Sequence, residues 1–259
     1  MRIAPIAAIF VAASSAATAQ ESRDPLATRP GFELGAQLSD YEYTEPGVIR
    51  LSGNRLSGIA ALTFAGESPV FGKIDLRTSF GRLLYEGSGT KNNVPDLILE
   101  TRAVAGFDLV GPSASLSPYA GLGYRYLFND LRGQSSTGAA GYRRYSNYLY
   151  APVGATARLR LREGWVLAPT LEADFFLQGK QITDLSDTGI AGLQDVTNTQ
   201  HSGHGYRGSL MFEREHWAFG AWLQYWHIAK SDVQSAGAFT GFEPENKTTE
   251  WGLEARYRF

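Results

Sequence analysis

The residue types best suited to chemistry gather in one polar stretch, His201-Ser202-Gly203-His204. A histidine beside a serine has the types of a general base and a nucleophile. Two histidines three residues apart, with Asp184, Asp187 or Asp195 nearby, also have the donor types of a metal site. A solvated Gly/Ser loop explains the same motif, and we adopt that interpretation. We therefore assign no catalytic residue and no metal ligand, and His201, His204, Asp184 and Asp187 stay candidates.

The elements that must position these side chains are strands, because the chain has a period of two. In the last nine residues, Trp251 to Phe259, every odd position is apolar or aromatic and every even position is glycine or charged. Such alternation marks a strand whose two faces meet different surroundings. An aromatic tip on the final strand is typical of a barrel whose outer face meets lipid. We interpret Trp251, Leu253, Tyr257 and Phe259 as a membrane-insertion signal; a soluble edge strand is the alternative.

About ten such segments follow one another from Gly31 onward, each bounded by turn residues. Polar side chains occupy the intervening, inward positions, with acids and bases in similar numbers. That parity suits a narrow lumen, where charges must pair because little water is available to solvate them. The predicted lumen charge network consists of Lys73, Asp75, Arg77, Glu100, Arg102, Arg125, Arg158, Arg160, Glu172, Asp174, Arg207, Glu254 and Arg256.

Connection lengths give an independent prediction. Short connections are expected near residues 66–69, 110–113, 162–164 and 213–216. Long polar loops are expected at 44–54, 85–95, 129–147, 179–203 and 230–247. Short periplasmic turns that alternate with long extracellular loops are typical of outer-membrane barrels. We predict an all-β, antiparallel, up-and-down transmembrane β-barrel of about ten strands, with eight or twelve as alternatives because the segment around Tyr206 is weakly patterned.

The N-terminus predicts export. Met1-Arg2 is followed by an apolar run and by Ala17-Thr18-Ala19, the pattern of a cleaved signal peptide. We expect a signal peptide over 1–19, a mobile periplasmic leader over 20–30 and the barrel over 31–259. A net charge of −2 gives no basic surface for nucleic acid. The absence of cysteine excludes disulfides, a lipoprotein anchor and thiolate metal sites.

The signal peptide, the strand Pro118–Tyr126 and the C-terminal Tyr257-Arg258-Phe259 resemble those of small Gram-negative outer-membrane barrels. In architecture, ten strands with tall outer loops are also similar to the omptin proteases. That resemblance implies two acidic residues on one side of the rim and an Asp–His pair on the other. Here the stretch Lys91–Asp96 has one acid, and Asp184 and Asp187 have no adjacent histidine. The omptin catalytic pattern is therefore missing.

The basic, aromatic segment Tyr142–Tyr148 could contact lipopolysaccharide phosphates or a glycan, and a membrane-interface girdle is the interpretation we favour. Our functional hypothesis is a monomeric, non-enzymatic outer-membrane barrel whose extracellular loops act in the envelope or in surface recognition. The alternatives are a narrow pore for small solutes and a rim hydrolase, either an omptin-like protease or a lipid A esterase. We expect outer-membrane lipids, lipopolysaccharide and the barrel assembly machinery as partners, and no cofactor.

Overall fold

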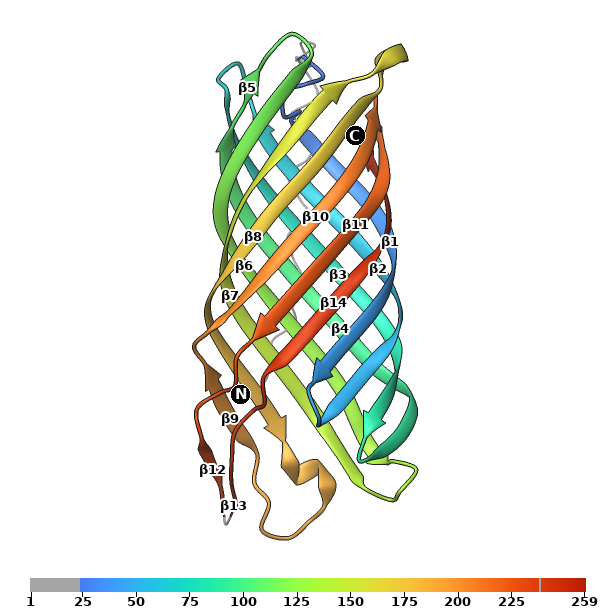
Figure 1. The fold of residues 1–259 in the computed structure, drawn as a ribbon, viewed down its shortest axis with the longest axis vertical. Helices are drawn as coiled ribbons and strands as arrows, with labels where there is room; N and C mark the ends of the chain where they lie inside the picture. The colour runs from blue at the N-terminus through green and yellow to red at the C-terminus, as the bar shows by residue number, and fades with distance from the viewer. Residues whose placement is uncertain (1–23, 238) are drawn as a thin grey trace.

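The computed structural model describes residues 24–237 and 239–259, so the predicted signal peptide lies outside the described residues. Its main elements are ten long antiparallel strands, which wind steeply around one axis (Figure 1). They are β1 (Gly31–Glu45), β2 (Ile49–Ala65), β3 (Val70–Gly87), β4 (Gly89–Phe107), β6 (Ala114–Gln134), β7 (Ala140–Arg160), β8 (Val166–Asp184), β10 (Gly203–Arg214), β11 (Trp217–Ile228) and β14 (Asn246–Arg258). The weakly patterned segment around Tyr206 is the regular strand β10.

Pairing of the first strand with the last closes the barrel. The register of β1 on β14 runs from Glu33 opposite Arg258 to Thr44 opposite Lys247. Every other long strand pairs with its neighbour in sequence, as expected for an up-and-down barrel. Short elements complete the fold: β5 (Leu109–Val110) pairs with β6, β9 (Val196–Gln200) extends the edge of β8, and β12 (Gln234–Ala236) pairs with β13 (Phe239–Gly241). Two short 3-10 helices lie at Arg162–Gly164 and Leu185–Thr188.

The predicted loop lengths are wrong at three positions. The strands continue far into the stretches expected to be loops, so the first three connections at that end shrink to residues 46–48, Ser88 and residues 135–139. Only 185–202 and 229–245 are long, and they carry β9 and the β12–β13 hairpin, which project from the lower end in Figure 1. This end, which we call the outer mouth, is therefore tall on one side and low on the other.

The strands were predicted too short because their faces exchange polarity part-way along. On the outer face of β1, exposed Leu34 and Leu38 give way to Asp40. On the inner face, buried Glu33 and Gln37 give way to buried Tyr41 and Tyr43. The period of two is unbroken, but the apolar residues move from even to odd positions, which reads in sequence as the end of a strand.

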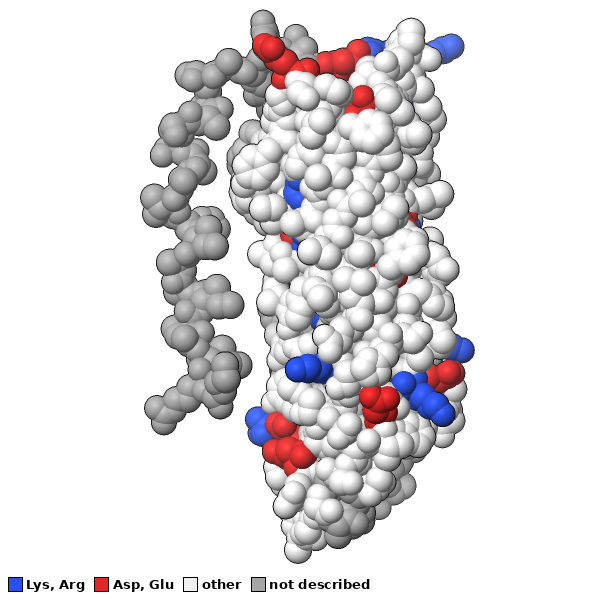
Figure 2. All heavy atoms as spheres, turned by 90° about the vertical axis from the view of Figure 1, so that its left-hand side faces the viewer, with Lys and Arg blue, Asp and Glu red and all other residues white. Residues whose placement is uncertain are grey.

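The outer surface reflects the same change of polarity. Figure 2 shows a broad, largely uncharged band on this face of the barrel, with most Lys, Arg, Asp and Glu toward its two ends. Leu38, Leu122, Leu171 and Leu253 are among the exposed side chains of this band. Among the described residues, no helix combines the length and the apolar character that crossing a membrane would need.

Residues 24–30 do not form the mobile leader that the sequence predicted. Leu26 is fully buried and Thr28 nearly so, inside the end of the barrel opposite the outer mouth. The backbone N–H of Thr28 donates to Asp108 Oδ2 at 3.0 Å, and Ser115 Oγ donates to the Leu26 carbonyl at 2.5 Å. We call residues 24–30 the strap, because they are tied across this inner mouth.

Candidate functional site

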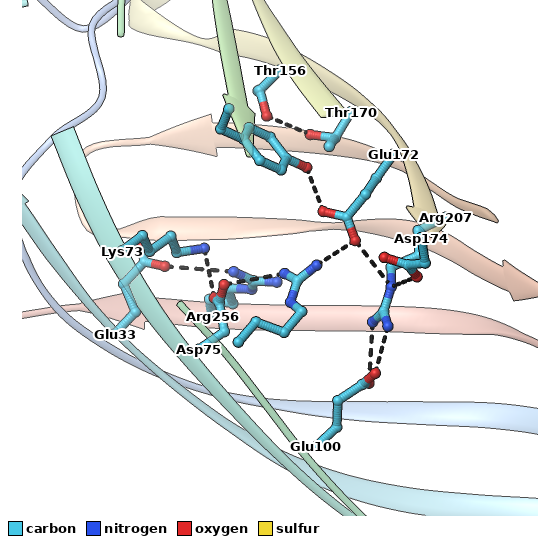
Figure 3. Close-up of polar contacts among 12 residues, drawn as sticks. Glu33, Lys73, Asp75, Glu100, Thr156, Thr170, Glu172, Asp174, Arg207 and Arg256 are labelled. Carbon is cyan, nitrogen blue, oxygen red and sulfur yellow. Dashed lines mark hydrogen bonds and ion pairs between the residues drawn. The ribbon is translucent and has the colours of Figure 1, made fainter. Parts of the chain in front are cut away.

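Arg207 organises the charged half of the interior. Its guanidinium lies 2.5 Å from Glu100 Oε1 and 2.7 Å from Asp174 Oδ2, with Glu172 Oε1 at 3.1 Å (Figure 3). These partners come from β4 and β8, which flank the lumen on two sides. A buried charge is tolerated when it is paired and hydrogen-bonded. Arg207 thus holds three carboxylates that could not be buried alone.

A second group of charges lies nearer the inner mouth. Arg102 joins Glu172, at 2.6 Å, to Asp75, at 3.1 Å. Lys73 Nζ lies 2.8 Å from Asp75 Oδ1 (Figure 3). Arg256 pairs with Glu254 in the same layer. A chamber of about 230 Å³ lies among these side chains and is covered at the inner mouth by the strap.

The structure places the remaining predicted lumen charges at different depths. Arg77 pairs with Glu250 in mid-barrel. Arg125 is 1% exposed, and its two terminal nitrogens have no hydrogen-bond partner among the described residues. Arg158 reaches Ser117 near the strap, whereas Arg160 lies at the exposed rim, 2.9 Å from Asp24.

Sequence reasoning missed the most completely buried ion pair among the described residues, Arg55 with Asp96. Both side chains are fully buried, and Arg55 also stacks 4.2 Å from the centre of the Tyr41 ring. Arg55 and Asp96 each come one residue before the first apolar residue of a predicted strand. Glu250 has the same position before Trp251 and was missed for the same reason. Continuing the period of two beyond the last apolar residue would have found all three.

On the side of the charged half that faces the outer mouth, an apolar septum spans the barrel. It consists of Tyr41, Tyr43, Leu51, Leu83, Val94, Ile98, Leu127, Leu131, Tyr148, Tyr150, Trp226 and Ile228, each at most 7% exposed. Tyr150 and Trp226 meet edge to face, 5.0 Å between ring centres, and Tyr150 donates its hydroxyl to Glu100 Oε1 at 2.8 Å on the charged side. Glycines make room for both rings: a Cβ at Gly123 would lie 2.2 Å from the Tyr150 ring, and one at Gly205 2.9 Å from Trp226.

A second cavity, of about 270 Å³, lies in the outer mouth, beyond the septum. Arg144 lies there, 4% exposed, and pairs with both Glu45 and Glu243. Burial and the neighbouring Glu45 carboxylate raise the pKa of the Glu243 carboxyl to about 7, although Arg144 acts to lower it. Two carboxylates therefore share one guanidinium at the base of this cavity.

The candidate catalytic residues are not brought together. His201 Nε2 bonds to Asp232 Oδ2 at 2.8 Å on an exposed loop, while His204 points outward from β10 and packs against Tyr206 and His227. Asp184 and Asp187 instead pair with Arg143 on the outside of β7. No group of three or more His, Cys, Asp or Glu side chains suited to a metal is found among residues 24–237 and 239–259.

The basic, aromatic segment is part of β7 rather than of a loop. Its side chains alternate, so Arg144 and Tyr148 point inward while Arg143 and Tyr145 point outward. The predicted insertion residues Trp251, Leu253 and Phe259 lie exposed on the outer face, at 60%, 67% and 64%. Phe259 stacks on Phe32 across the closing seam of the barrel.

No family model and no curated protein matches the sequence. Solved structures do match. The outer membrane protease OmpT from Escherichia coli has a TM-score of 0.58 at 10% identity, over 88% of this chain and 97% of that one. The fold is that of a small outer-membrane β-barrel. Neisserial surface protein A matches over 88% of this chain and 97% of its own at 12% identity, with a TM-score of 0.38.

The likeness of this outer-membrane barrel to OmpT is one of fold. The three acids considered for the omptin pattern do not lie together at the rim. Asp96 is buried in the lumen, whereas Asp184 and Asp187 pair with Arg143 outside it. No ion pair or hydrogen bond joins a histidine to these three acids among the described residues. The structure therefore assembles no omptin-like catalytic set from the candidates.

Proposed function

We propose that this protein is an integral outer-membrane protein of a Gram-negative bacterium, exported by the signal peptide at 1–19, and that it acts without enzymatic turnover through its outer mouth. The observation that carries this proposal is the septum. It separates the charged chamber from the cavity in the outer mouth, so the solvent-accessible chemistry facing the cell exterior is confined to that cavity and the loops around it.

The septum also argues against a static pore. Twelve buried side chains fill the barrel at this level, and protein interiors packed in this way leave no path for hydrated solutes. Inward arginines such as Arg102 and Arg207 are paired with carboxylates, and Arg125, which has no such partner among the described residues, is 1% exposed. Their arrangement stabilises a filled barrel rather than an anion-selective constriction.

We propose further that lipopolysaccharide contacts the outer face where its polarity changes. Arg82, Lys180 and Lys247 are exposed on three separate strands at this level. Cationic side chains at such a boundary suit the phosphates of that lipid. The C-terminal strand remains our predicted signal for the barrel assembly machinery.

Planar-bilayer conductance of the refolded mature chain tests the main proposal, with heat-modifiable migration on a gel as the folding control. We expect a folded barrel with no discrete current steps. The double substitution Tyr150→Ala and Trp226→Ala removes two of the largest rings of the septum and should introduce a measurable leak. Discrete steps in the unmodified protein would instead support the pore. Hydrolysis of a peptide or of lipid A that is lost on double replacement of His201 and His204 would support the rim hydrolase.

A further inference from the structure

The cavity of the outer mouth has the wall composition of a small-molecule site. Ile49, Leu131, Leu185 and Val196 supply aliphatic surface, and they come from four separate parts of the rim. Three aromatic rings, those of Tyr85, Tyr142 and Phe242, also line it. Its volume of about 270 Å³ is near the lower end of ligand pockets, roughly 300–1,000 Å³. The occupant should therefore be small and largely apolar.

The charged side chains at the base of the cavity determine which polar group of a ligand would bind there. The side chains of Glu45, Arg144 and Glu243 are 4%, 4% and 8% exposed. Tyr43 donates its hydroxyl to Glu45 Oε1 at 2.7 Å. Lys91, the other cation in the lining, donates its ammonium to the carbonyls of Leu131 and Arg132. Lys91 balances the formal charge of the whole lining, but its ammonium is held by those carbonyls, so at the base of the cavity two carboxylates pair with one guanidinium.

Two buried carboxylates on one guanidinium repel each other, and a proton or a bound cation relieves that repulsion. Aromatic rings attract cations through their negative faces, and rings around a quaternary ammonium are a recurrent way of binding it. We propose that the cavity in the outer mouth binds a small organic ammonium ion, with the charged head at Glu45 and Glu243 and the apolar body against the aromatic and aliphatic walls. This inference rests on the proposed function, in that it gives the outer mouth its ligand class.

Binding of such a cation should depend on pH, because the proton on Glu243 competes with it. The groups that face this carboxyl are Glu45 and Tyr43 of β1 and Tyr142, Arg144 and Tyr148 of β7. Glu243 has a pKa of about 7. A cation that binds only the ionised carboxyl should then gain about tenfold in affinity between pH 6 and pH 8.

Benzyltrimethylammonium is a suitable probe, because its charge does not change with pH. Titration calorimetry of the full folded protein in lipid nanodiscs should give saturable binding, with benzyl alcohol and benzoate, its neutral and anionic counterparts, at least about tenfold weaker. Glu243→Gln should weaken the cation by about tenfold or more at pH 8 and abolish the pH dependence. Glu45→Gln removes the other carboxylate, from the end of β1 rather than from the loop, and should act alike if Glu243→Gln fails to fold.

Glu245→Gln is the matched control, because Glu245 is an exposed carboxylate in the same loop, two residues away. This variant should bind like the unmodified protein. Three results would each overturn the ammonium site. They are equal affinity for all three probes, no saturable binding of the cation, and unchanged binding by a folded Glu243→Gln variant. A folded barrel that conducts no current and does not bind the cation refutes this inference alone. Discrete current steps from the unmodified protein refute the proposed function instead.

Discussion

Strand β1 has two halves that meet between Leu38 and Asp40, and the barrel interior differs on either side of that level. Toward the inner mouth, the outer face is apolar and the lumen is filled by ion pairs around Arg207 and Arg102. Toward the outer mouth, the outer face becomes polar and the lumen holds the septum, with the buried Arg55–Asp96 pair beside Tyr41 and the cavity around Arg144 beyond it. A barrel segment with an apolar outer face and a polar interior is suited to lipid surroundings. A segment with a polar outer face and an apolar interior is suited to water. The level of exchange is therefore where we place the outer membrane surface.

The two halves also differ in what they tolerate. Ion pairs in the charged half are mutually dependent, because each arginine serves several acids. The septum is held by packing, which loses stability one side chain at a time. Substitutions that separate these two kinds of interior, or that move the membrane level, test the comparison directly.

The largest effect is expected from Arg207→Ala. It leaves Glu100, Glu172 and Asp174 without their common partner, and breaking a buried pair costs about 3–5 kcal/mol. Urea unfolding in lipid vesicles measures the loss in the free energy of unfolding. Arg160→Ala, at the exposed rim, is the matched control and should cost about 0–1 kcal/mol. Equal losses for the two variants would contradict a charge network inside the barrel.

Two substitutions on the outer face of β14 locate the membrane surface. Ala255→Arg puts a charge well inside the apolar band, opposite Ala36 of β1, and should cost about 2–4 kcal/mol in the free energy of unfolding. Thr249→Arg is six residues nearer the outer mouth on the same face and should cost about 0–1 kcal/mol, because it meets water or headgroups. The same unfolding assay compares them. Similar costs at both positions would show that the level of exchange is misplaced.

The strap gives a smaller, local effect. Leu26→Asp replaces a fully buried side chain whose burial is worth about 1.5–3 kcal/mol, so the strap should detach and open the charged chamber. The protein has no cysteine, so a single Thr63→Cys in the chamber lining can report on access. A water-soluble thiol reagent should label it about tenfold faster or more in the Leu26→Asp background. An unchanged rate would mean that the strap does not close the chamber.

The smallest effect concerns the long loop 229–245 over the outer mouth. Docking raises the pKa of Glu243 from 4.5 to about 7, so the protonated carboxyl favours the docked loop. This stabilisation is complete below pH 4.5 and is lost as the pH rises through 7. Hydrogen exchange of the loop, corrected for intrinsic rates, should show docking about tenfold more favourable at pH 6 than at pH 8. Glu243→Gln should flatten this dependence; a dependence that survives the substitution points to another group.

The sequence by itself determined the barrel, because a period of two in ten segments leaves little choice of architecture. It also determined which charges point inward, such as Glu100, Glu172 and Arg207, since direction follows from position along a strand. Apolar alternation could not locate the strand ends on the outer side. The two faces exchange polarity there. From Asp40 onward the outward side chains are polar and the next two inward ones are aromatic, so a search for outward apolar residues ends at Leu38.

Only the tertiary structure decided the pairings. Arg144 meets Glu45 and Glu243, each 99 residues away, because strand register and the return of the loop 229–245 bring them to one level of the lumen. The strap is a similar case, since its polar, proline-containing sequence gives no sign that Leu26 is buried against strands far along the chain. Local patterns determine which way a side chain points, whereas closure of the barrel determines what that side chain contacts.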